Sequence, residues 1–203
     1  MAKRFKKMRS PIGEAVWPKL SQPETKFDPD GVYETKLRLD NQSGSAFQST
    51  LQEMLDEHHK QVCSEKGKKV KAASLPVTEV EEDGTPTGEY EFKFKLKALA
   101  GKEGNKWEQR PKLVDAKGAN IDPNKVTVGS GSKICIGFEV VPYFTAAVGA
   151  GLSLRMKAVQ VIDLVEYGGN EFDSYGFQQE EGYETSEAAE STTENVEEED
   201  CDF

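Results

Sequence analysis

The most regular pattern in the chain is the alternation of apolar and charged side chains between residues 89 and 98. The apolar set alternates with the charged set as follows: Tyr90, Phe92, Phe94, Leu96 and Ala98 against Glu89, Glu91, Lys93, Lys95 and Lys97. A period of two residues is typical of a β-strand that packs one face on a core. Residues 31–40 alternate in the same way, so both segments are predicted strands.

Further strands follow from turn residues and short apolar runs. Residues 76–82 are expected to form a hairpin with residues 89–98, because turn-forming residues occupy 83–88. Other strands are expected at 14–20, 112–115, 133–142 and 152–165, and glycine-rich loops at 129–132 and 148–151 precede the last two.

One segment, at about residues 46–66, has the 3.6-residue spacing of an amphipathic helix. Its apolar face consists of Phe47, Leu51, Met54, Leu55, His58 and Val62. Ser45 and Gln48 resemble a capping box, and Gly67 is a suitable stop. Six or seven strands with one helix favour a mainly β fold, best fitted by a closed or nearly closed antiparallel barrel of the five-stranded OB type with an inserted helix. A β-sandwich fits the pattern as well.

The charge distribution divides the chain into two parts. The whole sequence of 203 residues has a net charge of −10, which by itself argues against nucleic acid as a partner. Residues 166–203, however, hold 14 acidic and no basic side chains, whereas the preceding 165 residues hold 26 basic and 22 acidic ones, a net of +4. A mildly basic domain with an acidic tail often accompanies nucleic-acid binding.

Three parts are expected: a basic arm over residues 1–9, a barrel domain over 10–167 and a tail over 168–203. The tail is poor in aliphatic residues and rich in Glu, Ser, Thr and Gly. It cannot bury enough apolar surface to offset the entropy lost on ordering, so it is predicted to be disordered.

Targeting and redox signals indicate a soluble protein of a reducing compartment. No apolar run approaches the roughly 20 residues that cross a membrane, and no apolar stretch follows the basic N-terminus, so neither a membrane segment nor a secretory signal is expected. Cys63, Cys135 and Cys201 are odd in number and far apart, which fits neither a disulfide framework nor a metal site.

Lysines and aromatic residues supply the candidate DNA-binding side chains. Lys93, Lys95 and Lys97 recur at steps of roughly 6.6–7 Å on one strand face, close to the spacing of phosphates in a single strand. The alternative is an ordinary solvated face. Tyr143 and Phe144 lie where a strand ends in a loop, and such rings can stack on unpaired bases; the alternative is that both are core.

The two termini carry further candidates. The N-terminal arm, with Lys3 and Arg4, could clamp nucleic acid or simply solubilise the terminus. The last residue, Phe203, follows an acidic run that includes Asp200 and Asp202. A terminal ring and carboxylate can enter an apolar pocket rimmed by basic side chains, with the acids adding long-range attraction. A random acidic tail that happens to stop at Phe is the alternative.

Enzyme signals are weak, so no catalytic, metal or cofactor site is predicted. The sequence has no phosphate-binding loop, nucleophile elbow or metalloprotease helix. His58 and His59 are adjacent on the predicted helix and so face different directions. Asp28 and Asp30 resemble part of a calcium loop but lack the later ligands, and a turn is the better interpretation.

An ordered set of short segments resembles the phage single-stranded DNA-binding proteins of the gene-2.5 type. The segments are MAK at 1–3, GVY at 31–33, FKFK at 92–95, VDAKG at 114–118, GSGSK at 129–133, VVPY at 140–143, AVGA at 147–150 and the terminal DF. They agree in order and approximate spacing over residues 1 to about 165 and again at the C-terminus. No single motif is decisive, but the ordered set is a strong resemblance.

The resemblance implies an OB-fold, frequent dimerisation, and roles in DNA replication, recombination, repair and strand annealing in the cytoplasm of the infected bacterium. It further implies that the tail binds the phage DNA polymerase and primase–helicase and covers the DNA cleft when DNA is absent. By position it assigns DNA contact to Lys3, Lys93, Lys95 and Tyr143, and partner contact to Phe203. Lys133, in the GSGSK segment, joins the candidate DNA-binding residues.

The sequence also departs from the family pattern. Asp30 stands where a relative has a basic residue, Lys97 replaces an aromatic, and the loop after Tyr143 is shorter by one and lacks a lysine, with Phe144 in place of a tryptophan. A rearranged DNA contact is therefore expected there. The leading hypothesis is a sequence-independent binder of single-stranded DNA. The alternative is an acidic-tailed adaptor whose barrel binds no DNA; a nuclease is a distant third.

Overall fold

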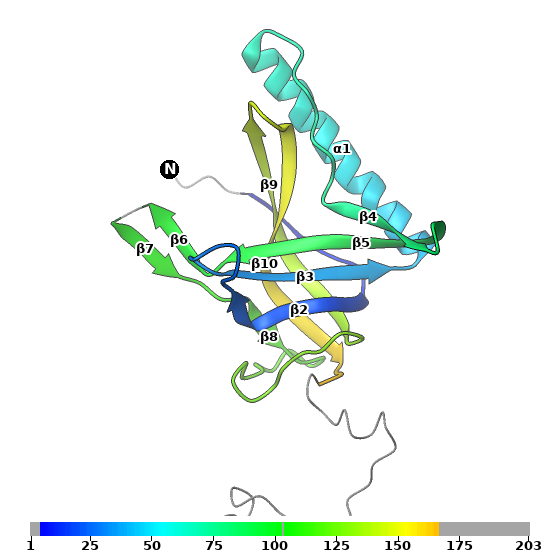
Figure 1. Ribbon diagram of the computed structural model, residues 1–203, viewed down its shortest axis with the longest axis vertical. Coiled ribbons are helices and arrows are strands. Elements are labelled where there is room, and N and C mark those ends of the chain that lie inside the picture. The colour runs from blue at the N-terminus through cyan, green and yellow to red at the C-terminus, as the bar shows by residue number, and fades with distance from the viewer. Residues whose placement is uncertain (1–4, 103, 167–203) are drawn as a thin grey trace, which may run out of the picture. The chain divides into compact units, whose positions relative to one another are not determined.

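The computed structural model describes residues 5–102 and 104–166, which contain one helix and ten strands (Figure 1). The helix is α1 (Asn41–Lys66). The strands are β1 (Lys6–Arg9), β2 (Gly13–Glu24), β3 (Val32–Leu39), β4 (Val77–Glu82), β5 (Thr85–Lys97), β6 (Leu99–Lys102), β7 (Asn105–Glu108), β8 (Lys112–Val114), β9 (Lys133–Thr145) and β10 (Gly149–Asp163).

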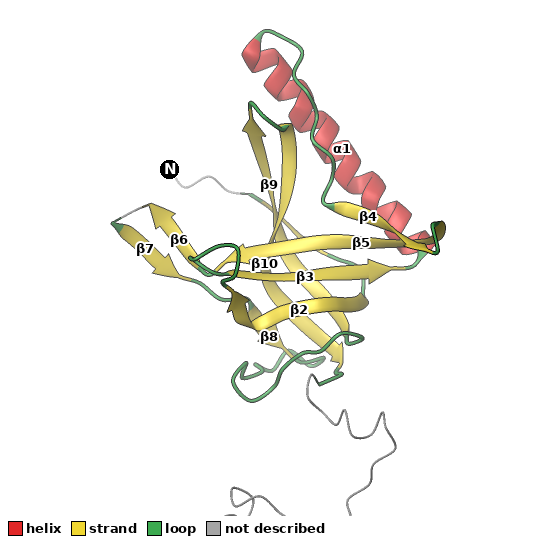
Figure 2. Ribbon diagram, viewed as in Figure 1, coloured by secondary structure: helices red, strands yellow, loops and turns green. Residues whose placement is uncertain are grey.

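Eight strands form one strongly curved sheet, and β6 and β7 form a separate hairpin beyond the end of β5 (Figure 2). The order along the sheet is β1-β9-β2-β3-β5-β10-β8, with β4 on β5 and a further pairing of β9 with β10. The sheet curls back because β10 pairs with both β9 and β5. The β5–β10 seam is a single residue pair, Arg155 with Lys95, so no continuous ladder closes the barrel there.

The prediction of a mainly β fold with one helix is confirmed, and its antiparallel character needs correction. β10 runs parallel to β5 and to β8, whereas the other pairings of the large sheet are antiparallel. The strands that line the core belong to one sheet, which differs from the two facing sheets of a sandwich. The predicted disordered tail lies outside the described residues.

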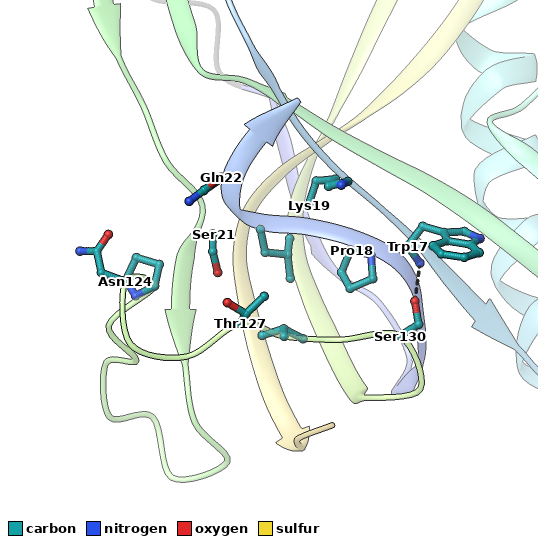
Figure 3. Close-up of a pocket in the computed structure, with 11 residues that line it drawn as sticks. Trp17, Pro18, Lys19, Ser21, Gln22, Asn124, Thr127 and Ser130 are labelled. Carbon is teal, nitrogen blue, oxygen red and sulfur yellow. Dashed lines mark hydrogen bonds between the residues drawn. The ribbon is translucent and has the colours of Figure 1, made fainter. Parts of the chain in front are cut away.

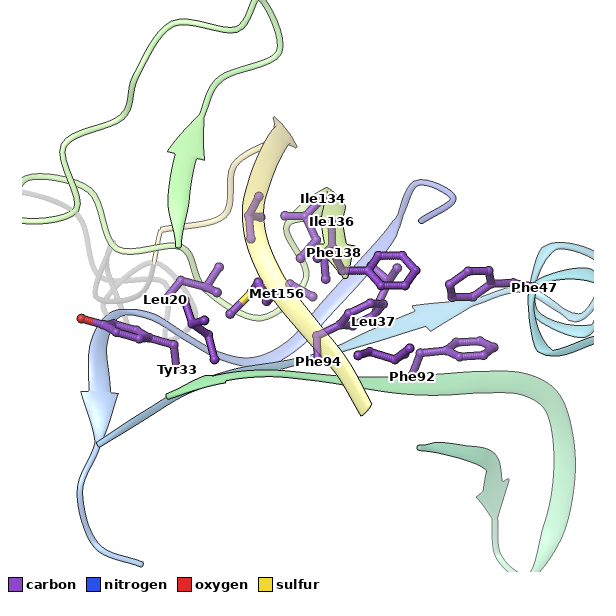
Figure 4. Packing of buried hydrophobic residues seen from close by; sticks show 14 of the residues in the cluster. Leu20, Tyr33, Leu37, Phe47, Phe92, Phe94, Ile134, Ile136, Phe138 and Met156 are labelled. Carbon is purple, nitrogen blue, oxygen red and sulfur yellow. The ribbon is translucent and has the colours of Figure 1, made fainter. Parts of the chain in front are cut away.

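The core lies on the concave side of this sheet (Figure 4). Phe94 and Phe138, from β5 and β9, meet edge to face with ring centroids 5.1 Å apart. Phe47 of α1 reaches the same cluster, 4.8 Å from Phe92. The apolar stripe of α1 is thereby buried, and the helix is held against the sheet by packing rather than by its own propensity.

The helix begins five residues before the predicted position. Asp40 is the N-cap, and its carboxylate accepts hydrogen bonds from Ser43 N and Ser43 Oγ. The proposed capping box at Ser45 and Gln48 is therefore wrong, because Ser45 lies inside the helix and donates to Gln42 O. The hydrogen bonds that Asp40 accepts from the backbone N–H and the hydroxyl of Ser43 lower its pKa. The predicted stop at Gly67 is confirmed, with φ at 64°.

One turn, one hairpin and the N-terminal segment also differ from the prediction. The β4–β5 turn is the pair Asp83 and Gly84, both with positive φ, so β5 starts at Thr85 and the predicted turn over 83–88 is too long. The β6–β7 hairpin was not predicted. Residues Lys6–Arg9 of the expected basic arm are strand β1, paired with β9. In the described chain, α1 is not apolar enough to span a membrane.

Candidate nucleic-acid interface

The side of the sheet opposite the core carries a row of charged residues from three neighbouring strands. We call this surface the outer face, formed by β3, β5 and β10 with Glu34, Lys36, Arg38, Lys93, Lys95, Lys97, Ser153 and Arg155. The register places Lys95 between Glu34 of β3 and Arg155 of β10. The three predicted lysines of β5 therefore share this face, and Arg155, which sequence reasoning missed, lies beside them.

Every lysine of the β5 row has a carboxylate nearby. Glu34 Oε2 lies 3.3 Å from Lys93 Nζ and 3.5 Å from Lys95 Nζ, and Asp28 Oδ2 lies 3.3 Å from Lys97 Nζ. Arg155 pairs with Glu139 of β9 at 3.7 Å. Since one carboxylate serves both Lys93 and Lys95, the row keeps a net positive charge.

At the β4 side of the outer face, Glu91 is the most enclosed carboxylate. It pairs with Lys36 at 2.7 Å and with Arg38 at 2.8 Å. Burial acts to raise the pKa of Glu91, but the hydrogen bonds and charges of Lys36 and Arg38 outweigh it, and the net pKa is lowered. Glu91 in turn raises the pKa of Arg38. The ion pairs of this trio are shorter than those of Lys93, Lys95 and Lys97, which lie 3.3–3.5 Å from their carboxylates.

At the other end, the loop before β3 supplies two further acids. A backbone hydrogen bond from Asp30 N, followed by the contact with Lys97, lowers the pKa of Asp28. Asp30 Oδ1 accepts from Lys106 Nζ of β7 at 2.6 Å. Asp30, the residue that departs from the family pattern, therefore binds a lysine of this chain.

Tyr143 lies on the same side of the sheet as the lysine row. It pairs with Gly151, and a side chain at position 151 would collide with its ring. Gly151 stands four residues before Arg155 on β10, a separation of roughly 13–14 Å. The ring is half-buried. His58 Nε2 donates to the carbonyl oxygen of Tyr143 at 2.9 Å, which ties this end of β9 to the helix.

Phe144 follows Tyr143 but faces the opposite side of β9. It is exposed, and Lys66 Nζ of α1 lies 5.1 Å from its ring centroid. The backbone after the helix holds the same hairpin, with Ala73 N donating to Ala150 O and Ala150 N donating to Lys71 O. The structure thus does not bring Phe144 to the outer face with Tyr143.

The remaining predicted residues lie elsewhere. Lys133 is at the far end of β9 from Tyr143, where it lies 3.9 Å from Glu14. Lys3 and Arg4, and the tail residues Asp200, Asp202 and Phe203, are outside the described residues. In the described ranges 5–102 and 104–166, no three metal-ligating side chains gather.

Two surface cavities are each lined by a tryptophan. One, of about 650 Å³, borders the outer face and the β6–β7 hairpin, and its lining includes Lys95, Lys97, Trp107 and Arg155. The other, of about 420 Å³, lies at the bulge of β2 (Figure 3). There Trp17 has a φ of 48° and its backbone N–H donates to Ser130 Oγ at 3.0 Å, but Lys19 is the sole cation in the lining.

Comparison with known sequences gives one family. The family model described as single-stranded DNA-binding protein of bacteriophage T7 matches residues 15–164. The single-stranded DNA-binding protein of Enterobacteria phage T3 is 28% identical over 187 residues, which span 85% of this chain and 80% of that protein.

Solved structures give the same fold. The crystal structure of gp2.5, a single-stranded DNA-binding protein encoded by bacteriophage T7, has a TM-score of 0.68 and 25% identity, covering 90% of this chain and 100% of that one. The protein of bacteriophage Enc34, solved in complex with single-stranded DNA, has a TM-score of 0.57 and 14% identity over 80% and 89% of the two chains. The second likeness concerns the fold alone, and both agree with an OB-like arrangement.

Proposed function

Because this chain belongs to the family of the bacteriophage T7 single-stranded DNA-binding protein, we propose that it binds unpaired DNA without sequence preference along its outer face. The family is not enzymatic, in agreement with the sequence prediction. The observation that carries the proposal is the strand register. It places Lys93, Lys95, Lys97 and Arg155 on one surface with the ring of Tyr143 about 14 Å along β10.

This arrangement has the two components of sequence-tolerant binding. A row of cations can follow the phosphates of a single strand, and an aromatic ring can stack on any base, since every base has a π-face. No base-specific hydrogen bonding is needed for either. The family relationship supports binding to single-stranded rather than double-stranded DNA.

The carboxylates of the outer face do not prevent this. Exposed ion pairs such as those of Glu34 with Lys93 and Lys95 contribute only about 0–1 kcal/mol each, because water screens both charges. A phosphate can therefore displace the carboxylate from its lysines at small cost.

The test is a gel shift of labelled oligo(dT) by the full chain over a range of salt concentrations. We expect binding at low salt and release as salt rises, because phosphate contacts release counterions. A matched double-stranded oligonucleotide serves as the control and should bind more weakly. The adaptor alternative predicts no shift of oligo(dT) at any salt concentration.

The tail is proposed to recruit replication proteins and to compete with DNA. Residues 166–203 carry 14 acids and no base, next to a basic domain, and Phe203 ends the chain. A tethered acidic segment is present at an effective concentration of order millimolar, enough to occupy a basic surface in the absence of DNA. The family relationship supports a phage DNA polymerase and primase–helicase as the partners of Asp200, Asp202 and Phe203.

Two variants separate these roles of the tail. Deletion of residues 168–203 should tighten oligo(dT) binding, most at low salt where attraction is least screened, and should abolish polymerase binding. Phe203→Ala keeps every acidic side chain, so DNA competition should persist while polymerase binding falls. Equal DNA affinity with and without the tail at low salt contradicts the competition, and normal polymerase binding by Phe203→Ala contradicts the role of the last ring.

The same family relationship supports action in replication, recombination, repair and strand annealing in the infected bacterial host, and assembly as a homodimer. Lys3 and Arg4 of the N-terminal arm are proposed to add phosphate contacts, because β1 leads directly from the arm onto β9, the strand of Tyr143. Sedimentation of the full chain at micromolar concentration tests the dimer. A monomer at all concentrations contradicts it.

A further inference from the structure

We propose that the cavity between the β6–β7 hairpin and the outer face is a second base-stacking subsite for unpaired DNA, with Trp107 as the stacking ring. The inference rests on the proposed function and adds a site to it. It extends the DNA path from Tyr143, past Arg155 and Lys95, to the end of β5. None of the sequence motifs pointed to this hairpin, and the assignment follows from what the structure brings together.

The cavity has the size and lining that a nucleotide requires. Its volume is about 650 Å³, within the roughly 300–1,000 Å³ typical of small-ligand sites. Lys95, Lys97 and Arg155 supply three cations from two strands, and Ser153 supplies a hydroxyl. The lining also contains Asp28 and Asp30, whose carboxylates pair with Lys97 and Lys106. Trp107 is the one aromatic side chain in its lining. Cations that meet phosphates, set beside a ring that meets a base, are the pair of elements that single-strand binding uses.

The indole ring of Trp107 packs closely on the backbone of the β6–β7 hairpin. Gly101, across the hairpin on β6, has a φ of 117°, and a side chain there would collide with the indole ring and with the Asn105 carbonyl. The glycine thus permits close packing of the ring on the hairpin backbone. Trp107 nevertheless remains 57% exposed, so much of its surface stays available.

The hairpin is also fixed relative to the lysine row. Gln109, which follows β7, donates from its backbone N to Ala98 O and from Nε2 to Lys97 O, both at 2.8 Å. Lys106 adds the contact with Asp30 on the loop before β3. The hairpin that carries Trp107 is therefore tied to the end of β5 and to the loop before β3, which limits the entropy lost when a base binds.

Trp17 supplies an internal reference. The chain contains two tryptophans, and Trp17 is the more exposed one at 69%. Its cavity, however, is lined by one lysine and by proline, serine and threonine residues. Exposure of an indole alone therefore does not distinguish the two positions. Trp107 differs from Trp17 because its cavity is lined by Lys95, Lys97 and Arg155 of the outer face.

The decisive experiment measures each indole separately during titration with oligo(dT). Trp17→Phe leaves Trp107 as the sole tryptophan, and Trp107→Phe leaves Trp17. We expect strong quenching of Trp107 emission on DNA binding, because a stacked base quenches an indole, and a much smaller change for Trp17. Unchanged Trp107 emission at a DNA concentration where the gel shift is complete overturns the subsite. Equal quenching of the two indoles also overturns it.

An affinity measurement completes the test. Trp107→Ala should weaken oligo(dT) binding by roughly five- to 100-fold without changing the salt dependence, and Trp107→Phe should restore most of the loss. Trp17→Ala is the matched control and should change affinity less than threefold. The quenching experiment retains Trp107 and so decides even where Trp107→Ala folds poorly. Intact protein that fails to shift oligo(dT) overturns the proposed function, whereas normal affinity of folded Trp107→Ala overturns the subsite alone.

Discussion

The two faces of β5 differ completely in what holds their side chains in place. Phe92, Phe94 and Leu96 on the inner face are no more than 2% exposed and interlock with rings from β9 and α1. The lysines on the outer face have side chains 39–61% exposed and are held by single ion pairs. Adjacent residues of β5 thus have different roles. Inner positions contribute to stability, and outer positions carry the residues that we propose bind DNA.

The largest effect is expected from the inner face. Phe94→Ala should reduce the free energy of unfolding by about 3–5 kcal/mol, because it removes a fully buried ring that packs on Phe138 and leaves a cavity. Urea denaturation followed by circular dichroism measures the change. Protein that remains folded should keep the salt dependence of oligo(dT) binding. A loss below about 1 kcal/mol would contradict the separation of the two faces.

The next effect tests the same distinction on β9. Tyr143→Ala should weaken oligo(dT) binding by about 1–3 kcal/mol with an unchanged salt slope, because a stacking ring releases no counterions. Fluorescence anisotropy at several salt concentrations measures both quantities. Phe144→Ala is the matched control, since its ring lies on the other side of the strand near Lys66. A larger loss of affinity in Phe144→Ala would mean that DNA binds the side of β9 opposite Tyr143, which contradicts the proposed path.

The lysine row should change binding with little change in stability. Lys93→Ala combined with Lys95→Ala should flatten the log–log salt slope by roughly 0.7 for each lost phosphate contact. The free energy of unfolding should stay within about 0.5 kcal/mol of the original, because both side chains lie on the surface. Lys68→Ala with Lys69→Ala, in the exposed loop after α1, removes the same charge as a control. Identical slopes for the two double variants would show that the β5 row is only a solvated face.

The smallest effect concerns Glu91 and acid. Its lowered pKa means that the ion pairs with Lys36 and Arg38 stabilise the fold above the usual carboxyl pKa of 4.5, and that this contribution is lost as pH falls through the lowered value. Glu91→Gln should therefore be less stable than the original at pH 7, by up to about 1 kcal/mol, and equally stable near pH 2. Urea unfolding at the two pH values measures the difference. A stability gap that persists at pH 2 would mean that Glu91 acts through packing.

Local patterns were sufficient for the two faces of the strands and for the helix. Alternation over residues 89–98 places Phe92, Phe94 and Leu96 inside and the lysines outside, because successive side chains of a strand point to opposite faces whatever its partner. The apolar stripe of α1 and its stop at Gly67 follow from equally local rules. The same rules predicted the helix start wrongly, because Asp40 and Ser45 are both residue types that suit a cap, and it is the Asp40 carboxylate that accepts from Ser43 N.

Local sequence patterns could not predict which distant segments pair with one another. The parallel pairing of Arg155 with Lys95 joins residues 60 positions apart, and the seat of Trp107 depends on Gly101 across a hairpin too short and polar to show a period. The strand predicted over residues 133–142 also continues to Thr145 through its pairing with β10, so Tyr143 and Phe144 lie in β9 and face opposite sides rather than lying in a loop. The sequence by itself thus determined which side chains face the core, since that depends on neighbours in the chain. Only the tertiary structure decided which outward-facing residues meet, because loop closure and core packing set the register between strands.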